Sequence, residues 1–168
     1  MVKTATLITG LVFAFTIENA LPAYAFGPQT QVVSLEDALE KLIPEAPKGA
    51  TSWRTLGKAE VVENKKTGTI SPKFPAAIKK LDGKEIDIVG FLFPIETGEK
   101  QEHFLLSALP PSCPFCLPAG PNYLMDVKAA KGIDFSYDPV HLKGKLQLLD
   151  ASDAYQMFYR LNHATVVR

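Results

Sequence analysis

The chain has 168 residues, of which 46% are hydrophobic and 21% charged, and its 18 Lys and Arg balance its 18 Asp and Glu. This size and composition are typical of one globular domain. Like charges form no run longer than pairs such as Lys65-Lys66, so nothing favours nucleic acid or an anionic membrane as a partner. Thirteen Pro and eleven Gly are more than a helical bundle would tolerate, which favours strands and turns.

Residues 1–25 have the pattern of a secretory signal peptide. Lys3 supplies a positive charge, the run from Ala5 to Ile17 is mostly apolar, and an A-x-A-type cleavage site ends at Ala25. An apolar run of about a dozen residues is shorter than the roughly 20 that a membrane span needs. We therefore expect cleavage after Ala25, no stable membrane anchor, and a mature protein that is periplasmic or secreted.

Residues 26–80 are expected to form an N-terminal arm with a short helix. Ser34 is a candidate N-cap for apolar residues that recur at helical spacing until Pro44. Trp53 is predicted to pack against the domain that follows. The segment from Glu63 to Ser71 is polar enough to predict a mobile loop.

From Lys84 onward the hydrophobic period changes to two, which indicates strands. In the first of them, Gly90 would let the strand coil around a barrel corner. Short turns pair consecutive strands antiparallel, so residues 81–168 predict a mainly β domain, a small five-stranded antiparallel OB-like barrel, with an open sandwich as the alternative. The strands are expected near residues 84–92, 103–108, 123–127, 140–149 and 157–167.

Both cysteines, Cys113 and Cys116, lie in a proline-rich loop between the second and third of these strands. Five prolines between Leu109 and Asn122 fix φ and remove backbone donors, so the loop is stiff. It holds two sulfurs three residues apart in a set geometry. This arrangement suits a disulfide, a redox couple or a metal site.

A disulfide between Cys113 and Cys116 would close a ring of about four residues and stabilise the fold by only roughly 2 kcal/mol. A redox couple is the second use, since short C-x-x-C disulfides exchange readily with thiols. Cys-Pro-Phe-Cys is also the kind of tetrapeptide found in glutaredoxin-like active sites. The context argues against that fold, because the Leu-Pro-Ala-Gly-Pro that follows cannot propagate a helix.

The third use is a transition-metal site, because two thiolates are half of a tetrahedral zinc site and also suit Cu(I). Only His103, His141 and His163 could add an imidazole. The common alternative for each is a surface or half-buried histidine without a ligand. His103 is the strongest candidate because its strand leads into the cysteine loop. Leu117 in place of a histidine after the motif excludes covalent c-type haem.

The sequence contains no G-x-S-x-G nucleophile elbow of a hydrolase, no phosphate-binding loop and no dinucleotide-binding motif. The acidic residues Asp126, Asp134 and Asp138 lack the spacing of a calcium-binding loop.

The sequence thus favours an exported, non-enzymatic binding or accessory protein in which Cys113 and Cys116 bind zinc or, second, Cu(I). His103 is the candidate third ligand. The alternatives are a periplasmic thiol–disulfide redox protein and a binding module with a purely structural disulfide. The partner is expected to be a metal or a protein of the periplasm.

Five motifs in the second half of the chain carry a family resemblance. They are LDGK at 81–84, GFLFP at 90–94, HFLLS at 103–107, PPSCPFCLPAGP at 110–121 and FYRL at 158–161. In their order and density they resemble the domain-of-unknown-function family numbered 3299, with Trp53 as its first landmark. The resemblance implies a bacterial protein exported with a signal peptide, and it does not choose among the three uses of the cysteines.

Overall fold

The computed structural model describes residues 40–111, 119–150 and 157–167, all within one compact unit, Val33–Arg168. The predicted signal peptide, the predicted helix from Ser34 up to residue 39, and both cysteines lie outside these ranges. Within them, no helix is long and apolar enough to cross a membrane. The elements are α2 (Trp53–Leu56), β1 (Glu60–Glu63), β2 (Ile70–Lys73), α3 (Ala76–Lys79), β3 (Glu85–Pro94), β4 (Lys100–Ser107), η1 (Pro121–Tyr123), β5 (Leu124–Asp134), β6 (Val140–Leu148) and β7 (Tyr159–Val166).

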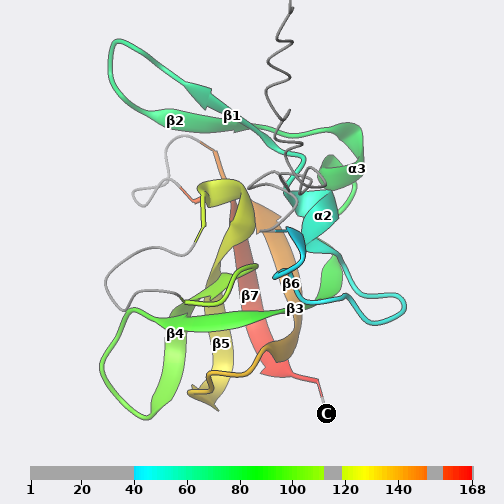
Figure 1. Cartoon of the computed structure of the whole chain (residues 1–168), viewed down its shortest axis with the longest axis vertical. Helices are drawn as coiled ribbons and strands as arrows, with labels where there is room; N and C mark the ends of the chain where they lie inside the picture. Colours follow the sequence, from blue (N-terminus) through cyan, green and yellow to red (C-terminus); the bar gives the residue numbers. More distant parts are fainter. Residues whose placement is uncertain (1–39, 112–118, 151–156, 168) are drawn as a thin grey trace, which may run out of the picture. The chain divides into compact units, whose positions relative to one another are not determined.

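Five strands close into a barrel in the order β3-β4-β5-β7-β6 (Figure 1). The prediction of a mainly β protein with a five-stranded barrel and short helices is confirmed. The expectation that the barrel is antiparallel throughout is wrong, because β5 and β7 run parallel, with Asp126 opposite Arg160. Strand direction reverses from one strand to the next at every antiparallel pair. A barrel with an odd number of strands can therefore close only if at least one neighbouring pair is parallel.

Alternate residues of each strand fill the barrel. On β3, Ile86, Ile88 and Leu92 are buried, while the alternate residues Asp87, Val89 and Phe91 are half-buried. Gly90 takes the remaining inward position, where a Cβ would lie 2.7 Å from the Ser107 carbonyl oxygen. At this glycine the partner of β3 changes from β6 to β4. The missing side chain at Gly90 thus lets β4 approach where β3 passes from one neighbour to the other.

The segment before the barrel is attached to it through α2. Trp53 is buried and donates from Nε1 to the Val89 carbonyl oxygen of β3 at 2.8 Å, as the predicted packing requires. The Tyr159 hydroxyl of β7 donates to the Leu56 carbonyl oxygen at the other end of α2, at 2.6 Å. The helix begins after Ser52, whose hydroxyl oxygen accepts a backbone N–H of the first turn.

The sequence predicts a mobile loop from Glu63 to Ser71, but this segment is not a loop throughout. It includes the turn of a hairpin in which β1 and β2 pair antiparallel, with Glu63 opposite Ile70 (Figure 1). All four residues of β1 are exposed. A strand that buries none of its residues, as β1 does, needs no alternation of apolar and polar residues, so the pattern that predicts the barrel strands cannot detect this hairpin.

Candidate functional site

The candidate site lies on the outer face of β4, β5 and β7, which are neighbours in the barrel. Successive side chains of a strand point to opposite faces, so the residues between the core positions point outwards. They include His103 on β4, Asp126 on β5 and Arg160 on β7. Asp126 stands opposite Leu105 on one side and Arg160 on the other. Its carboxylate is therefore flanked from both neighbouring strands.

The Asp126 carboxylate is 4% exposed and has a partner for each oxygen. Oδ1 lies 2.6 Å from Nε2 of His103, and Oδ2 accepts from Nε of Arg160 at 2.5 Å. The His103 and Arg160 side chains retain partial exposure. A buried carboxylate without partners would be costly, so these three side chains form one hydrogen-bonded unit across three strands.

This pairing assigns a role to each ring nitrogen of His103. An ionised carboxylate only accepts hydrogen bonds, so Nε2 carries the proton that Asp126 accepts, and in the neutral ring Nδ1 keeps its lone pair. Nδ1 lies 3.6 Å from Oε1 of Glu96, in the connection between β3 and β4. A carboxylate behind a histidine is the arrangement that orients metal-ligating imidazoles.

A pocket of about 260 Å³ adjoins the unit. Its lining combines apolar side chains with one imidazole and two carboxylates: Ile95, Glu96, His103, Leu105, Asp126 and Met157. Leu105 and Met157 also belong to an apolar cluster with Leu124, Leu149 and the partly buried Ala119. Apolar walls with a few converging polar groups are typical of ligand-binding pockets.

The structure describes only part of the predicted metal site. His103 lies on the strand expected for it, whereas Cys113 and Cys116 lie outside the described residues. Within the described ranges, no three His, Cys, Asp or Glu side chains form a group that could hold a metal ion. A metal at His103 would therefore need ligands from outside those ranges.

The other two histidines do not line this pocket. His141 on β6 has Nε2 3.8 Å from Oδ2 of Asp87, and that nitrogen has no hydrogen-bond partner among the described residues. His163 on β7 has a φ of 54°, where the register of β7 against β6 shifts. Its left-handed backbone therefore belongs to a β-bulge.

Sequence reasoning did not find the partners of His103. Spacing alone gives Asp126 no role, although an acid between Met125 and Val127 in an apolar strand is a signal of a buried, paired charge. Arg160 belongs to the FYRL motif that carries the family resemblance, but nothing in that motif indicates a partner for it. It meets Asp126 through the parallel pairing of β5 and β7, which neither hydrophobic period nor turn length predicts.

Comparisons with known proteins give a family and a solved structure. The family described as "Protein of unknown function (DUF3299)" matches residues 39–168. A DUF3299 family protein from Pseudomonas aeruginosa, known from a crystal structure, is 25% identical in sequence to this chain. The match covers 58% of this chain and 68% of that one, and the two structures superpose with a TM-score of 0.46. No curated protein matches the chain.

Proposed function

The chain belongs to the DUF3299 family, whose function is unknown, and from the geometry around His103 we propose an exported, non-enzymatic metal-binding or accessory protein. Cys113 and Cys116 bind a transition metal, zinc first and Cu(I) second, and Nδ1 of His103 is the third ligand. The observation that carries the proposal is the 2.6 Å contact between Asp126 and Nε2 of His103. A histidine held in this way presents its other nitrogen as an oriented and more basic ligand.

The chain connectivity supports the participation of the cysteines. Ala119 packs in the same apolar cluster as Leu105 and Met157, and both of these line the His103 pocket. Two residues, Leu117 and Pro118, separate Cys116 from Ala119, so three Cα–Cα steps of at most about 3.8 Å each join them. Covalent geometry therefore keeps the Cα of Cys116 within about 11 Å of that of Ala119.

Glu96 is the candidate for a fourth ligand. Its Oε1 lies 3.6 Å from Nδ1 of His103, and its side chain is more than half exposed, so an ion can reach it from solvent. Two thiolates, one imidazole and one carboxylate or water match a tetrahedral zinc site. The thiolates without a carboxylate would suit Cu(I) better.

We also propose that the barrel is of the OB type. The strand order supports this, because OB folds are five-stranded Greek-key barrels that bind ligands on their second and third strands and on two loops. Those loops join the first to the second strand and the fourth to the fifth. The His103 pocket uses the corresponding parts: β4 and β5, Glu96 from the β3–β4 connection, and Met157 from the β6–β7 connection.

The localisation proposal is that the protein acts in the periplasm, or outside the cell, after cleavage following Ala25. The N-terminal charge, apolar run and cleavage pattern of the sequence support it. N-terminal sequencing of the protein recovered from a periplasmic fraction tests it. A mature chain that begins at Phe26 is the expected result, and an intact N-terminus in the cytoplasmic fraction would contradict it.

Metal analysis of protein purified under reducing conditions without a chelator tests the main proposal. We expect stoichiometric zinc or copper, lost in Cys113→Ser, and an affinity about 10- to 100-fold weaker in Asp126→Asn, which removes the charge that orients His103. His141→Ala is the matched control, because it removes an imidazole outside the pocket. Only traces of metal, unchanged by Cys113→Ser, would overturn the proposal.

The same cysteines distinguish the two alternatives. A redox protein would be recovered fully oxidised, would exchange its disulfide with thiols at a defined potential, and would lose that exchange in Cys113→Ser. A structural disulfide would show no exchange, and replacing both cysteines by serine would lower the unfolding free energy by roughly 2 kcal/mol.

A further inference from the structure

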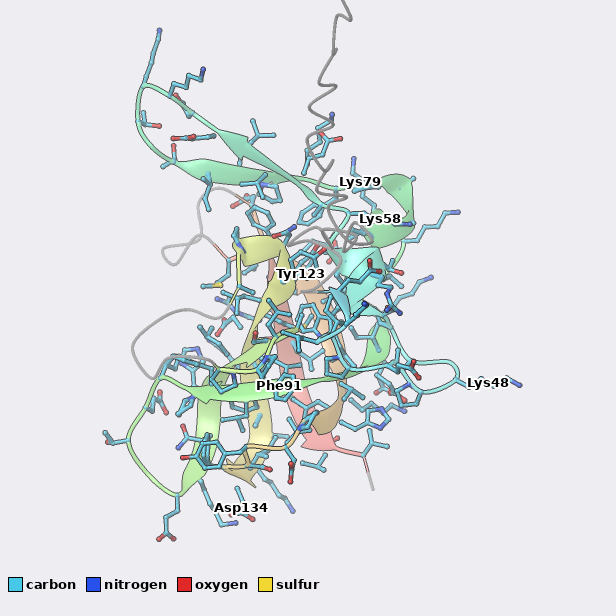
Figure 2. The ribbon with its side chains drawn as sticks, viewed as in Figure 1. Lys48, Lys58, Lys79, Phe91, Tyr123 and Asp134 are labelled. Carbon is cyan, nitrogen blue, oxygen red and sulfur yellow. The ribbon has the colours of Figure 1, made fainter. Side chains whose placement is uncertain are left out.

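A second and larger hollow, of about 620 Å³, lies where the β3–β4 connection meets the end of β5. Figure 2 shows Asp134 at this end of β5. Only Glu96 is shared with the His103 pocket. The residues lining the hollow are Pro94, Glu96, Gly98, Glu99, Gln101, Asp134, Phe135 and Tyr137.

The pairing of β4 with β5 brings the two sides of this hollow together. The pairing of β4 with β5 shifts register between Gln101 and His103, after which Gln101 stands opposite Ile133 and Lys100 opposite Asp134. Because the two strands are antiparallel, the end of β5 lies against the start of β4. The residues that follow β5 are thereby carried to the β3–β4 connection.

The charge of the lining has one sign. Glu96, Glu99 and Asp134 contribute carboxylates, and none of the described lining residues is Lys, Arg or His. Lys100 forms an ion pair with Asp134 at 3.1 Å and offsets one of these charges. Glu96 also lies 3.6 Å from Nδ1 of His103 and is the proposed fourth metal ligand, so Glu99 is the carboxylate that the metal proposal leaves to a cationic ligand.

Two aromatic rings stand beside the carboxylates. Phe135 and Tyr137 are 38% and 80% exposed, and their ring centroids lie 4.8 Å apart in an edge-to-face arrangement. Aromatic faces attract cations. An adjoining pair of exposed rings is also the apolar surface against which the stem of a ligand can pack.

Gln101 gives an independent sign of a missing donor. Its side chain is 2% exposed, and its Nε2 donates to the Gly98 carbonyl oxygen at 2.5 Å, which fixes which way the amide faces. Its Oε1 is buried and accepts no hydrogen bond from any described residue. Buried amide oxygens in folded proteins nearly always have a partner. The hollow therefore combines acceptors, negative charge and aromatic faces.

We propose that this hollow binds a guanidinium group on an apolar stem. Glu99 supplies the opposite charge, Phe135 and Tyr137 pack against the planar group and its stem, and Gln101 Oε1 accepts an N–H. Guanidinium fits better than ammonium because it is planar, stacks on aromatic rings and offers five donors in a fixed fork. The source is a free alkylguanidine or an arginine side chain of a protein segment.

Titration of the purified protein, followed by NMR, tests this proposal. The probes are butylguanidinium, its neutral isostere butylurea, and a terminally blocked Gly-Arg-Gly peptide. We expect saturable shifts of the Tyr137 backbone and Gln101 side-chain amides with both cationic probes and not with butylurea. A tighter fit of the peptide than of butylguanidinium would identify a protein segment as the source, and equal or weaker binding would identify the free cation. Equal shifts with butylurea, or no saturable shift with either cation, would overturn the proposal.

Variants of exposed side chains locate the binding. Tyr137→Leu and Glu99→Gln are each expected to weaken butylguanidinium binding by about two- to fivefold. Glu63→Gln is the matched control, because it removes the same charge from the exposed β1–β2 hairpin. Cys113→Ser should bind the cation as the unaltered protein does, which separates this result from the metal proposal. Unchanged binding in both Tyr137→Leu and Glu99→Gln would contradict the assigned site.

Discussion

Replacing Tyr159 by phenylalanine removes a single hydroxyl group that joins β7 to α2. The hydroxyl donates to the Leu56 carbonyl oxygen at 2.6 Å, and both residues are fully buried. The carbonyl keeps a second donor, the Ala59 N–H at 3.0 Å, so the substitution leaves no unsatisfied acceptor. The ring itself, which packs against Phe74 and Phe158, is retained. We therefore expect the unfolding free energy to fall by about 1 kcal/mol, the net value of one neutral hydrogen bond.

The same substitution should change the response to alkali. Burial, with a smaller contribution from Tyr123, raises the pKa of the Tyr159 phenol well above its ordinary value of 10.0. Above about pH 10 the unfolded chain loses this proton while the folded chain keeps it. The folded state then binds more protons, so its stability falls as pH rises, by up to about 1.4 kcal/mol per pH unit from this residue. Tyr159→Phe should lack that contribution.

Urea unfolding followed by the fluorescence of Trp53, the single tryptophan, measures both effects. Tyr137→Phe is the matched control, because its ring is 80% exposed and should change neither stability nor alkaline slope. A loss of more than about 3 kcal/mol would mean that the ring packing had changed rather than one hydrogen bond. An alkaline slope identical in Tyr159→Phe and the unaltered protein would refute the argument from burial.

Three further substitutions test the fold and the site by chemical unfolding. Gly90→Ala should lower the unfolding free energy by about 1–3 kcal/mol, because its Cβ would meet the Ser107 backbone oxygen at 2.7 Å; an unchanged midpoint would contradict the close approach. Trp53→Phe, followed by circular dichroism, should lose at least about 1 kcal/mol with the indole bond to Val89, and no loss would disprove that anchor. Asp126→Asn should lose about 2 kcal/mol because its single amide oxygen can accept from only one of the two donors, His103 and Arg160, and a gain in stability would show that the buried charge is a net cost.

The sequence could predict those parts of the fold that depend on local pattern. Alternation along the barrel strands reflects one buried face, and Gly90 and Trp53 are conspicuous within their segments. The β1–β2 hairpin could not be predicted in this way, because β1 buries none of its residues. Of the candidate site, the sequence indicates only that His103 lies on a strand that leads into the cysteine loop. Asp126 and Arg160 meet it only through the register of three strands that are distant in sequence.

The position of β7 has a consequence for how the protein acquires its site. β7 is last of the five strands in chain order, yet it lies between β5 and β6. A folding intermediate with only β3 to β6 formed would leave β5 and β6 with unpaired edges, which are prone to associate with other chains. The contacts that close the ring join residues far apart in sequence, which slows folding. Arg160 reaches Asp126 only when β7 docks, so the orientation of His103 would be completed in the same event as barrel closure, and ligand binding could serve as a kinetic probe of that last step.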